Sequence, residues 1–198
     1  MIKEPYKFKS VADWEKITQA LIAEHPLSKD DVVKAVLAAW NDLFKSKIGP
    51  YQIGVDIFPK PQIVGFFLHE LIPLKLKTKY PKMWDVDKAK NDKDIVCLKD
   101  SNYSIEIKTS SNPGKVFGNR SYGMTSDNPS AARKSKSGYY LLVNFQPPAP
   151  GKKGKVLRIR FGWIDASDWK SQAAQTGQQA SLPDDVYKKK MVELFVEN

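Results

Sequence analysis

The chain has 198 residues, of which 41% are hydrophobic and 27% charged, and its formal net charge is +10. These values are typical of one globular domain, and no run of about 18 apolar residues is present for a membrane helix. The charged N-terminus does not resemble a secretory signal, and the lone Cys97 excludes an intrachain disulfide. We therefore expect a cytoplasmic protein without membrane association, whose basic charge favours a polyanionic partner.

The N-terminal part, about residues 1–78, has the periodicity of helices. Ser10 and Asp13 resemble an N-cap pair in front of a helix that ends near residue 25. Ser28 opens a second helix, whose apolar stripe ends before residue 49. Residues 62–76 are so apolar that they predict a third helix buried on most sides, with Pro73 kinking or ending it.

The pattern changes to strands at about residue 94 and stays so to about 165, as a hairpin followed by two further strands. Between them, residues 110–137 are polar and predict a functional loop. Helical signals return over about residues 167–198. The chain therefore predicts a single domain of residues 1–198 in the α/β class, with helices flanking a mostly antiparallel or mixed sheet.

The strongest candidate site is the hairpin that carries Asp94, Glu106 and Lys108. On a strand, residues i and i+2 face the same side, so Glu106 and Lys108 point together while the isoleucines beside them face a buried side. A three-residue loop at 100–102 would set Val96 opposite Glu106 and Asp94 opposite Lys108. All three charged residues would then share one face of the sheet.

Two carboxylates beside an ammonium favour a hard divalent cation, Mg²⁺ above all, with Asp94 and Glu106 as its ligands. The metal and Lys108 would offset the charge that develops on a phosphoryl group, and metal-bound water is easier to deprotonate. This combination predicts phosphodiester hydrolysis. The alternative is an exposed cross-strand salt bridge between Asp94 and Lys108 on a solvated sheet face.

The acidic residue and the Glu-x-Lys triplet of this hairpin resemble the metal site of the PD-(D/E)XK nucleases, although Lys93 stands where that motif has proline. The segments 105–111 (IEIKTSS), 117–122 (FGNRSY) and 161–165 (FGWID) resemble, more specifically, the ScaI-like group of type II restriction endonucleases. The resemblance implies a restriction-endonuclease-like core, in which a central mixed β-sheet is flanked by helices. It also implies Mg²⁺-dependent cleavage of double-stranded DNA at a short specific sequence.

Glu70 lies in the apolar third helix, and in many nucleases of this kind a helix before the hairpin adds an acidic group to the metal site. The alternative is a capped or surface-facing glutamate at the end of that helix. We interpret His69 as a partly buried histidine with satisfied hydrogen bonds rather than a ligand, and Cys97 as a small core residue.

Basic residues are concentrated after the candidate catalytic strand. Between residues 111 and 160, ten Lys and Arg, Arg160 among them, stand against one acidic residue, which leaves a net charge of +9. Lys and Arg can contact DNA phosphates, and Arg, Asn and Gln can read base edges. The alternative is a solvated basic surface. The DNA-contact candidates are Asn119, Arg120, Arg133, Lys134, Lys136, Gln178 and Gln179.

The leading hypothesis is a Mg²⁺-dependent type II restriction endonuclease with Asp94, Glu106 and Lys108 as catalytic residues and Glu70 as an assisting one. Two rivals are a structure-selective repair or junction-resolving nuclease and a non-catalytic, sequence-specific DNA-binding protein. One such hairpin cuts one strand, and the chain has no internal repeat, so we expect a homodimer that reads a palindromic site. A monomer that makes two successive nicks is the alternative.

Overall fold

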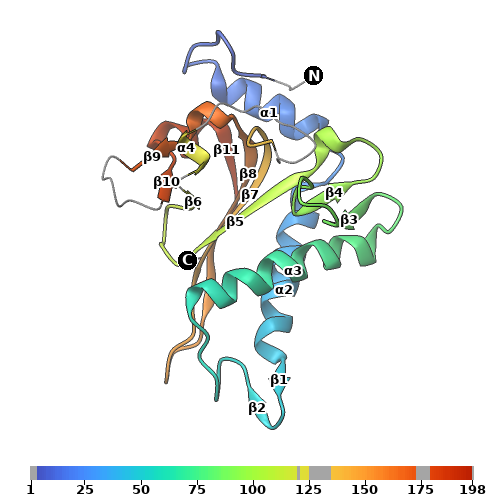
Figure 1. The fold of residues 1–198 in the computed structure, drawn as a ribbon, viewed down its shortest axis with the longest axis vertical. Helices are drawn as coiled ribbons and strands as arrows, with labels where there is room; N and C mark the ends of the chain where they lie inside the picture. The colour runs from blue at the N-terminus through green and yellow to red at the C-terminus, as the bar shows by residue number, and fades with distance from the viewer. Residues whose placement is uncertain (1–3, 120, 125–134, 173–178, 198) are drawn as a thin grey trace.

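A six-stranded mixed sheet with strand order β11-β8-β7-β5-β4-β3 forms the centre of the protein (Figure 1). The computed structural model describes residues 4–119, 121–124, 135–172 and 179–197. Strands β5 and β7 run parallel, and the other neighbouring pairs are antiparallel. The expected α/β class is therefore confirmed. The strands are β3 (Trp84–Val86), β4 (Ile95–Cys97), β5 (Ile105–Ser110), β7 (Gly138–Gln146), β8 (Lys155–Ile164) and β11 (Met191–Val196).

The predicted N-terminal helices are present. The helices are α1 (Trp14–Glu24), α2 (Lys29–Lys45), α3 (Pro61–Lys79) and the short α4 (Ser121–Met124). In α2, Ser28 is the N-cap, and its side chain accepts the backbone N–H of Asp31 at 3.1 Å. The apolar stripe of α2 is buried, and it includes Val36 and Leu43. None of the described helices is long and apolar enough to cross a bilayer.

Helix α3 differs from expectation in two ways. Pro73 does not end it, because the helix continues to Lys79 and is held against α2 by ion pairs of Lys75 with Asp42 and of Lys79 with Asp31. Nor is it buried on most sides. One face packs under α2, while the side chains of Ile63, Phe66 and Leu74 remain between 44% and 58% exposed.

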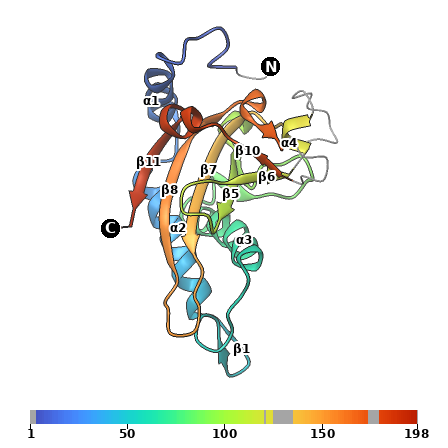
Figure 2. The ribbon, with the colours of Figure 1, turned by 90° about the vertical axis from the view of Figure 1, so that its left-hand side faces the viewer.

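Two apolar clusters lie on the two faces of the sheet. The larger one joins α1, α2 and α3 to the side chains of β5, β7 and β8 that include Ile105, Ile107 and Phe161. The smaller one contains Tyr140 and Trp169, and a second sheet lies over it with strand order β6-β10-β9. Figure 2 shows α1 and α2 on one side of β7 and β8, and β6, β10 and α4 on the other. The remaining strands are β1 (Lys47–Ile48), β2 (Tyr51–Gln52), β6 (Phe117–Asn119), β9 (Lys170–Ser171) and β10 (Gln179–Ser181).

The expectation of helices over residues 167–198 is only partly confirmed. The described residues of this range contain a 3₁₀ turn at Ala166–Asp168 and a π-helix at Val186–Lys190, but residues 191–196 form β11, the edge strand of the central sheet. A bulge between Glu193 and Phe195 interrupts its pairing with β8 and breaks the two-residue alternation. The sequence of β11 therefore lacks the periodicity of a strand, and only its pairing with β8 defines it.

Candidate active site

Strand β5 presents Glu106 and Lys108 on the face opposite its buried isoleucines. Ile105 and Ile107 are fully buried in the larger apolar cluster. Because side chains alternate along a strand, Glu106 and Lys108 face the second sheet. The parallel pairing of β5 with β7 places Glu106 beside Tyr140. The sequence-based orientation of this strand is confirmed.

Glu106 is 3% exposed and receives two hydrogen bonds on the same oxygen, Oε1. Lys108 Nζ donates to it at 2.6 Å, and the Tyr122 hydroxyl donates to it at 2.9 Å. Burial alone would lower the pKa of the Lys108 ammonium, but attraction by Glu106, Tyr122 and Asp94 outweighs burial and raises it. Lys108 is therefore a fixed positive charge at neutral pH.

Asp94 lies against β5 between the two charged residues. Its Oδ2 accepts the backbone N–H of Ile107 at 2.6 Å and lies 3.5 Å from His69 Nδ1. The three charged residues of the hairpin are thus brought together, and α3 adds His69 next to Asp94. Only its place next to Glu70 in the sequence could have indicated this contact.

The register of the hairpin differs from the predicted one by two residues. Ile95 pairs with Ile105, which sets Asp94 toward Glu106 instead of Lys108. The connection is longer than three residues, because Ser101–Tyr103 forms a 3₁₀ turn and Ser104 Oγ accepts the N–H of Cys97. A shift of two residues preserves the face to which each side chain points, so the predicted grouping survives the wrong register.

A cleft of about 690 Å³ opens beside Asp94. Helix α3 forms one wall with His69 and Glu70, and the end of β5 and the loop after it form another. Glu70 lies on the exposed side of α3 and reaches this cleft, as does Asp87. Glu70 is therefore surface-facing, as one of the two interpretations expected. It still lines the same cleft as Asp94, so the assisting role stays a prediction.

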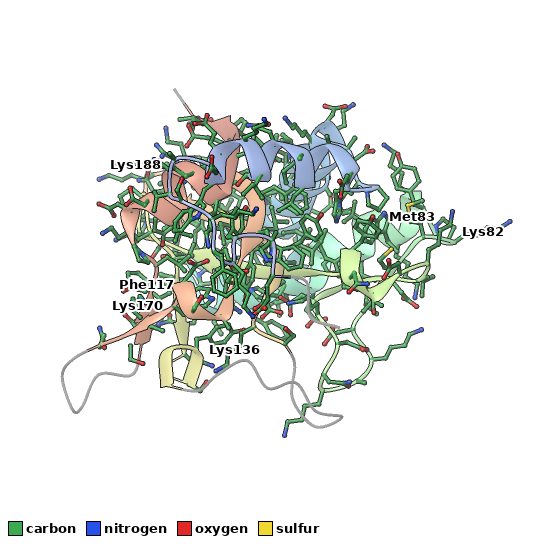
Figure 3. The ribbon with its side chains drawn as sticks, turned by 90° about the horizontal axis from the view of Figure 1, so that it is seen from above. Lys82, Met83, Phe117, Lys136, Lys170 and Lys188 are labelled. Carbon is green, nitrogen blue, oxygen red and sulfur yellow. The ribbon has the colours of Figure 1, made fainter. Side chains whose placement is uncertain are left out.

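Two predicted DNA-contact residues are neighbours in space. Asn119 of β6 pairs with Gln179 of β10, although 59 residues separate them in the sequence. Both are exposed, and Gln179 also lines the cleft beside Asp94. Lys136 lies close by, with its ammonium 5.7 Å from the ring of Tyr122. Figure 3 shows Lys136 on the side of the molecule that carries Phe117 of β6.

Other DNA-contact candidates lie outside the described residues. They are Arg120, Arg133, Lys134 and Gln178.

Arg160 is not available to DNA, contrary to its place in the basic segment. It is 5% exposed, and its Nη1 donates to the carbonyl of Gly114 at 3.0 Å. Asn144, fully buried, donates to the carbonyls of Asn112 and Lys115 at 2.7 and 3.0 Å. These side chains hold the loop that leads from β5 to β6, so part of the basic segment is structural.

Comparison with known proteins identifies the family. A family model described as ScaI restriction endonuclease matches residues 4–195. The type II restriction enzyme ScaI of Streptomyces caespitosus is 47% identical over 182 residues, which cover 90% of this chain and 79% of that protein. The chain belongs to the ScaI restriction endonuclease family. It is a sequence-specific type II restriction endonuclease, a hydrolase that acts on DNA, as the resemblance in the sequence implied.

Type II restriction enzymes generally use a divalent metal ion, and the donor set of this ScaI-family chain fits one. Asp94, directly before β4, and Glu106 of the neighbouring strand β5 offer carboxylate oxygens. Within the described ranges, no three His, Cys, Asp or Glu side chains cluster closely enough to hold a metal ion. Two carboxylates suit Mg²⁺, which keeps several waters and commonly shares substrate phosphates as ligands.

Proposed function

We propose that Asp94 and Glu106 hold Mg²⁺ and that Lys108 is the catalytic cation of this restriction endonuclease. The observation that carries the proposal is that Asp94 lies against β5, the strand that bears Glu106 and Lys108, and that Asp94 lines an open cleft. Bound Mg²⁺ would supply Lewis-acid polarisation of the scissile phosphate and a more acidic water. The alternative interpretation, in which these charged residues form only a salt bridge, requires no metal ion. Metal binding by the carboxylates therefore distinguishes the two.

Lys108 contributes a cation and a hydrogen-bond donor. Its ammonium donates to Glu106 at 2.6 Å, and it can also donate to an attacking water or to a phosphoryl oxygen. Glu70 lines the same cleft as Asp94, and we assign it an assisting role there, through water or the metal. His69 stands next to Asp94 and orients that carboxylate.

Digestion of a DNA of known sequence with Mg²⁺ tests the assignment. Asp94→Asn should lower the cleavage rate by at least about 100-fold while the protein still folds and binds DNA. Asp100→Asn is the matched control, because it makes the same change at the turn of the same hairpin, where asparagine can also accept the Asn102 N–H. Wild-type fragments at a normal rate from Asp94→Asn would show that the metal site is elsewhere.

We propose that Asn119 and Gln179 read base edges and that Lys136 contacts phosphate. Alanine at Asn119 or Gln179 should reduce discrimination between cognate and altered sites by about 1–3 kcal/mol. Lys136→Ala should instead reduce the slope of log K against log salt by about 0.9. Exposed Lys82, which Figure 3 shows on a different side, provides the control, and Lys82→Ala should leave the slope unchanged.

We further propose that the enzyme is a homodimer that cuts a palindromic site, one strand per subunit. The support is an exposed apolar surface on the β1–β2 hairpin and the segment after it, in which Ile48, Tyr51 and Val55 are 58% to 62% exposed. Surfaces of this kind commonly mark protein interfaces. The cytoplasm stays the proposed location, since a DNA-cutting enzyme has to meet DNA.

Sedimentation of the enzyme tests the dimer. The wild type should sediment at twice the subunit mass of 22.4 kDa, and Ile48→Lys combined with Val55→Lys should sediment as a monomer. Phe8→Lys is the control, because Phe8 is 95% exposed and belongs to the N-terminal segment instead. A wild-type monomer that accumulates nicked circles during plasmid digestion would overturn the dimer.

A further inference from the structure

Tyr122 of α4 contacts the proposed active site in two ways. Its hydroxyl donates to Glu106 Oε1, the atom that also accepts Lys108 Nζ. Its ring lies under the Lys108 ammonium, 4.8 Å from nitrogen to ring centroid. One side chain therefore contacts both the carboxylate and the cation of the proposed catalytic pair.

The ring of Tyr122 packs closely against the second sheet. Trp169 packs edge-on against it, with ring centroids 5.0 Å apart. Gly118 of β6 lies beneath it, and a Cβ atom at that position would stand 3.1 Å from Tyr122 Cγ and 3.2 Å from Trp169 Cζ3. The absence of a side chain at Gly118 lets the strand and both rings approach closely.

Helix α4 is fixed from its other side as well. A Cβ atom at Gly123 would stand 2.3 Å from the backbone nitrogen of Ser171, so only glycine lets α4 lie this close to β9. Strands β6 and β9 thus hold the short helix that carries Tyr122 from two directions. The close packing of α4 against β6 and β9 therefore fixes the position of the Tyr122 hydroxyl next to Glu106.

We propose that Tyr122 is a positioning residue that orients the Glu106 carboxylate for metal binding. The inference rests on the proposed function, in which Glu106 is a metal ligand. Ligating carboxylates are commonly held by hydrogen bonds from neighbouring groups, and loss of such a partner typically weakens metal affinity or activity about 10- to 100-fold. Tyr122 and Lys108 both donate to Oε1 and so restrain it.

Tyr122→Phe removes the hydroxyl and keeps the ring over Lys108. Mn²⁺ binding to the protein, measured by electron paramagnetic resonance without DNA, should weaken about 10- to 100-fold in this variant. The Mg²⁺ concentration for half-maximal cleavage should rise by a similar factor, while the KM for DNA stays unchanged. Thermal melting of each variant confirms that folded protein is compared.

Tyr187→Phe is the matched control. Tyr187 is partly buried against the same apolar cluster, and its hydroxyl bonds to the backbone of Val116 instead of a carboxylate. This variant should bind Mn²⁺ as the wild type does. If Mn²⁺ binding weakened equally in Tyr122→Phe and Tyr187→Phe, the effect would come from altered packing and the proposal would be overturned.

Glu106→Gln distinguishes failure of the proposed metal site from failure of the proposed positioning role of Tyr122. If it binds Mn²⁺ as the wild type does, the proposed metal site is wrong. If it loses Mn²⁺ binding while Tyr122→Phe binds Mn²⁺ within twofold of the wild type, only the positioning role of Tyr122 is wrong.

Discussion

Lys108 at the proposed active site and Lys190 directly before β11 both have little exposure and lie against carboxylates. Lys190 Nζ lies within 3.0 Å of three carboxylate oxygens, one from Asp165 and two from Asp168. The rings of Tyr6 and Trp14 cover it at 4.1 and 4.2 Å, and its side chain is 2% exposed. Every direction from this ammonium is occupied by protein.

The Lys108 cluster has the same chemistry in a different enclosure. Its side chain is 14% exposed, it has one close carboxylate partner in Glu106, and Asp94 beside it lines an open cleft. A buried lysine and carboxylate therefore do not by themselves indicate catalysis. What separates the two clusters is that Asp94 of the Lys108 cluster lines an open cleft, so we expect that cluster to serve activity and the Lys190 cluster to serve stability.

The largest expected effect comes from replacing the active-site pair together. Glu106→Gln combined with Lys108→Met should lower cleavage by about 100- to 1,000-fold or more, because both the metal ligand and the catalytic cation are lost. The free energy of unfolding should stay the same or rise, since replacing both partners of a buried ion pair is often neutral or stabilising. Chemical denaturation measures the free energy of unfolding. A large decrease in the double variant would contradict the view that this pair serves activity rather than stability.

Lys190→Met should show the opposite behaviour. It leaves Asp165 and Asp168 buried without their cation, which should lower the free energy of unfolding by about 3–5 kcal/mol. Burial already raises the pKa of Asp168 against the effect of Lys190, so loss of the lysine should raise it further. Unfolding by urea at pH 7 checks the prediction, and an unchanged midpoint would refute it.

His25 is a buried titratable group that has no charged partner among the described residues, so its effect on stability should depend on pH. Its Nε2 faces the carbonyl of Tyr103 and its Nδ1 accepts the N–H of Leu27, each at 3.1 Å. Burial lowers its pKa from 6.5 to about 4. Because the folded pKa lies below the unfolded one, its contribution to stability is complete above pH 6.5 and is lost as the pH falls toward 4.

The loss from His25 should reach about 3 kcal/mol at the acidic end of this range. In His25→Gln, the free energy of unfolding should depend less on pH between 6.5 and 4 than in the wild type. Denaturation curves at several pH values give the comparison. Parallel pH profiles for the two proteins would mean that His25 does not titrate as proposed.

The smallest effect is expected at an exposed pair. Lys34 and Asp30 form an i,i+4 ion pair on α2, with side chains 68% and 71% exposed. Lys34→Ala should change the free energy of unfolding by less than about 0.5 kcal/mol, because solvent screens both charges. If Lys34→Ala lowered the free energy of unfolding as much as Lys190→Met, burial would not determine how much these ion pairs stabilise the protein.

Much of the active site could be predicted because its strand is regular. Alternation along β5 was enough to place Glu106 and Lys108 on one face, and that grouping tolerated a register error of two residues. The buried stripe of α2 and its Ser28 cap were equally local signals. Each depends on residues a few positions apart, which periodicity can detect.

The remaining features depend on contacts between distant segments. The pairing of Asn119 with Gln179 exists only because β10 returns beside β6, and Tyr122 reaches Glu106 only because Gly118 permits the approach. Strand β11 was missed because a bulge breaks its alternation, and α3 continues past Pro73 because ion pairs and packing against α2 hold it. No local pattern encodes these contacts.

The most direct test of the active-site assignment is the cleavage rate per folded molecule in Lys108→Met and Lys190→Met. Both variants remove one buried ammonium and keep a side chain of similar length. Single-turnover cleavage with Mg²⁺ is measured at a temperature where both are folded, and each rate is corrected for the folded fraction. We predict that Lys190→Met cuts at the wild-type rate and that Lys108→Met is at least about 100-fold slower. Equal rates in the two variants would contradict the assignment.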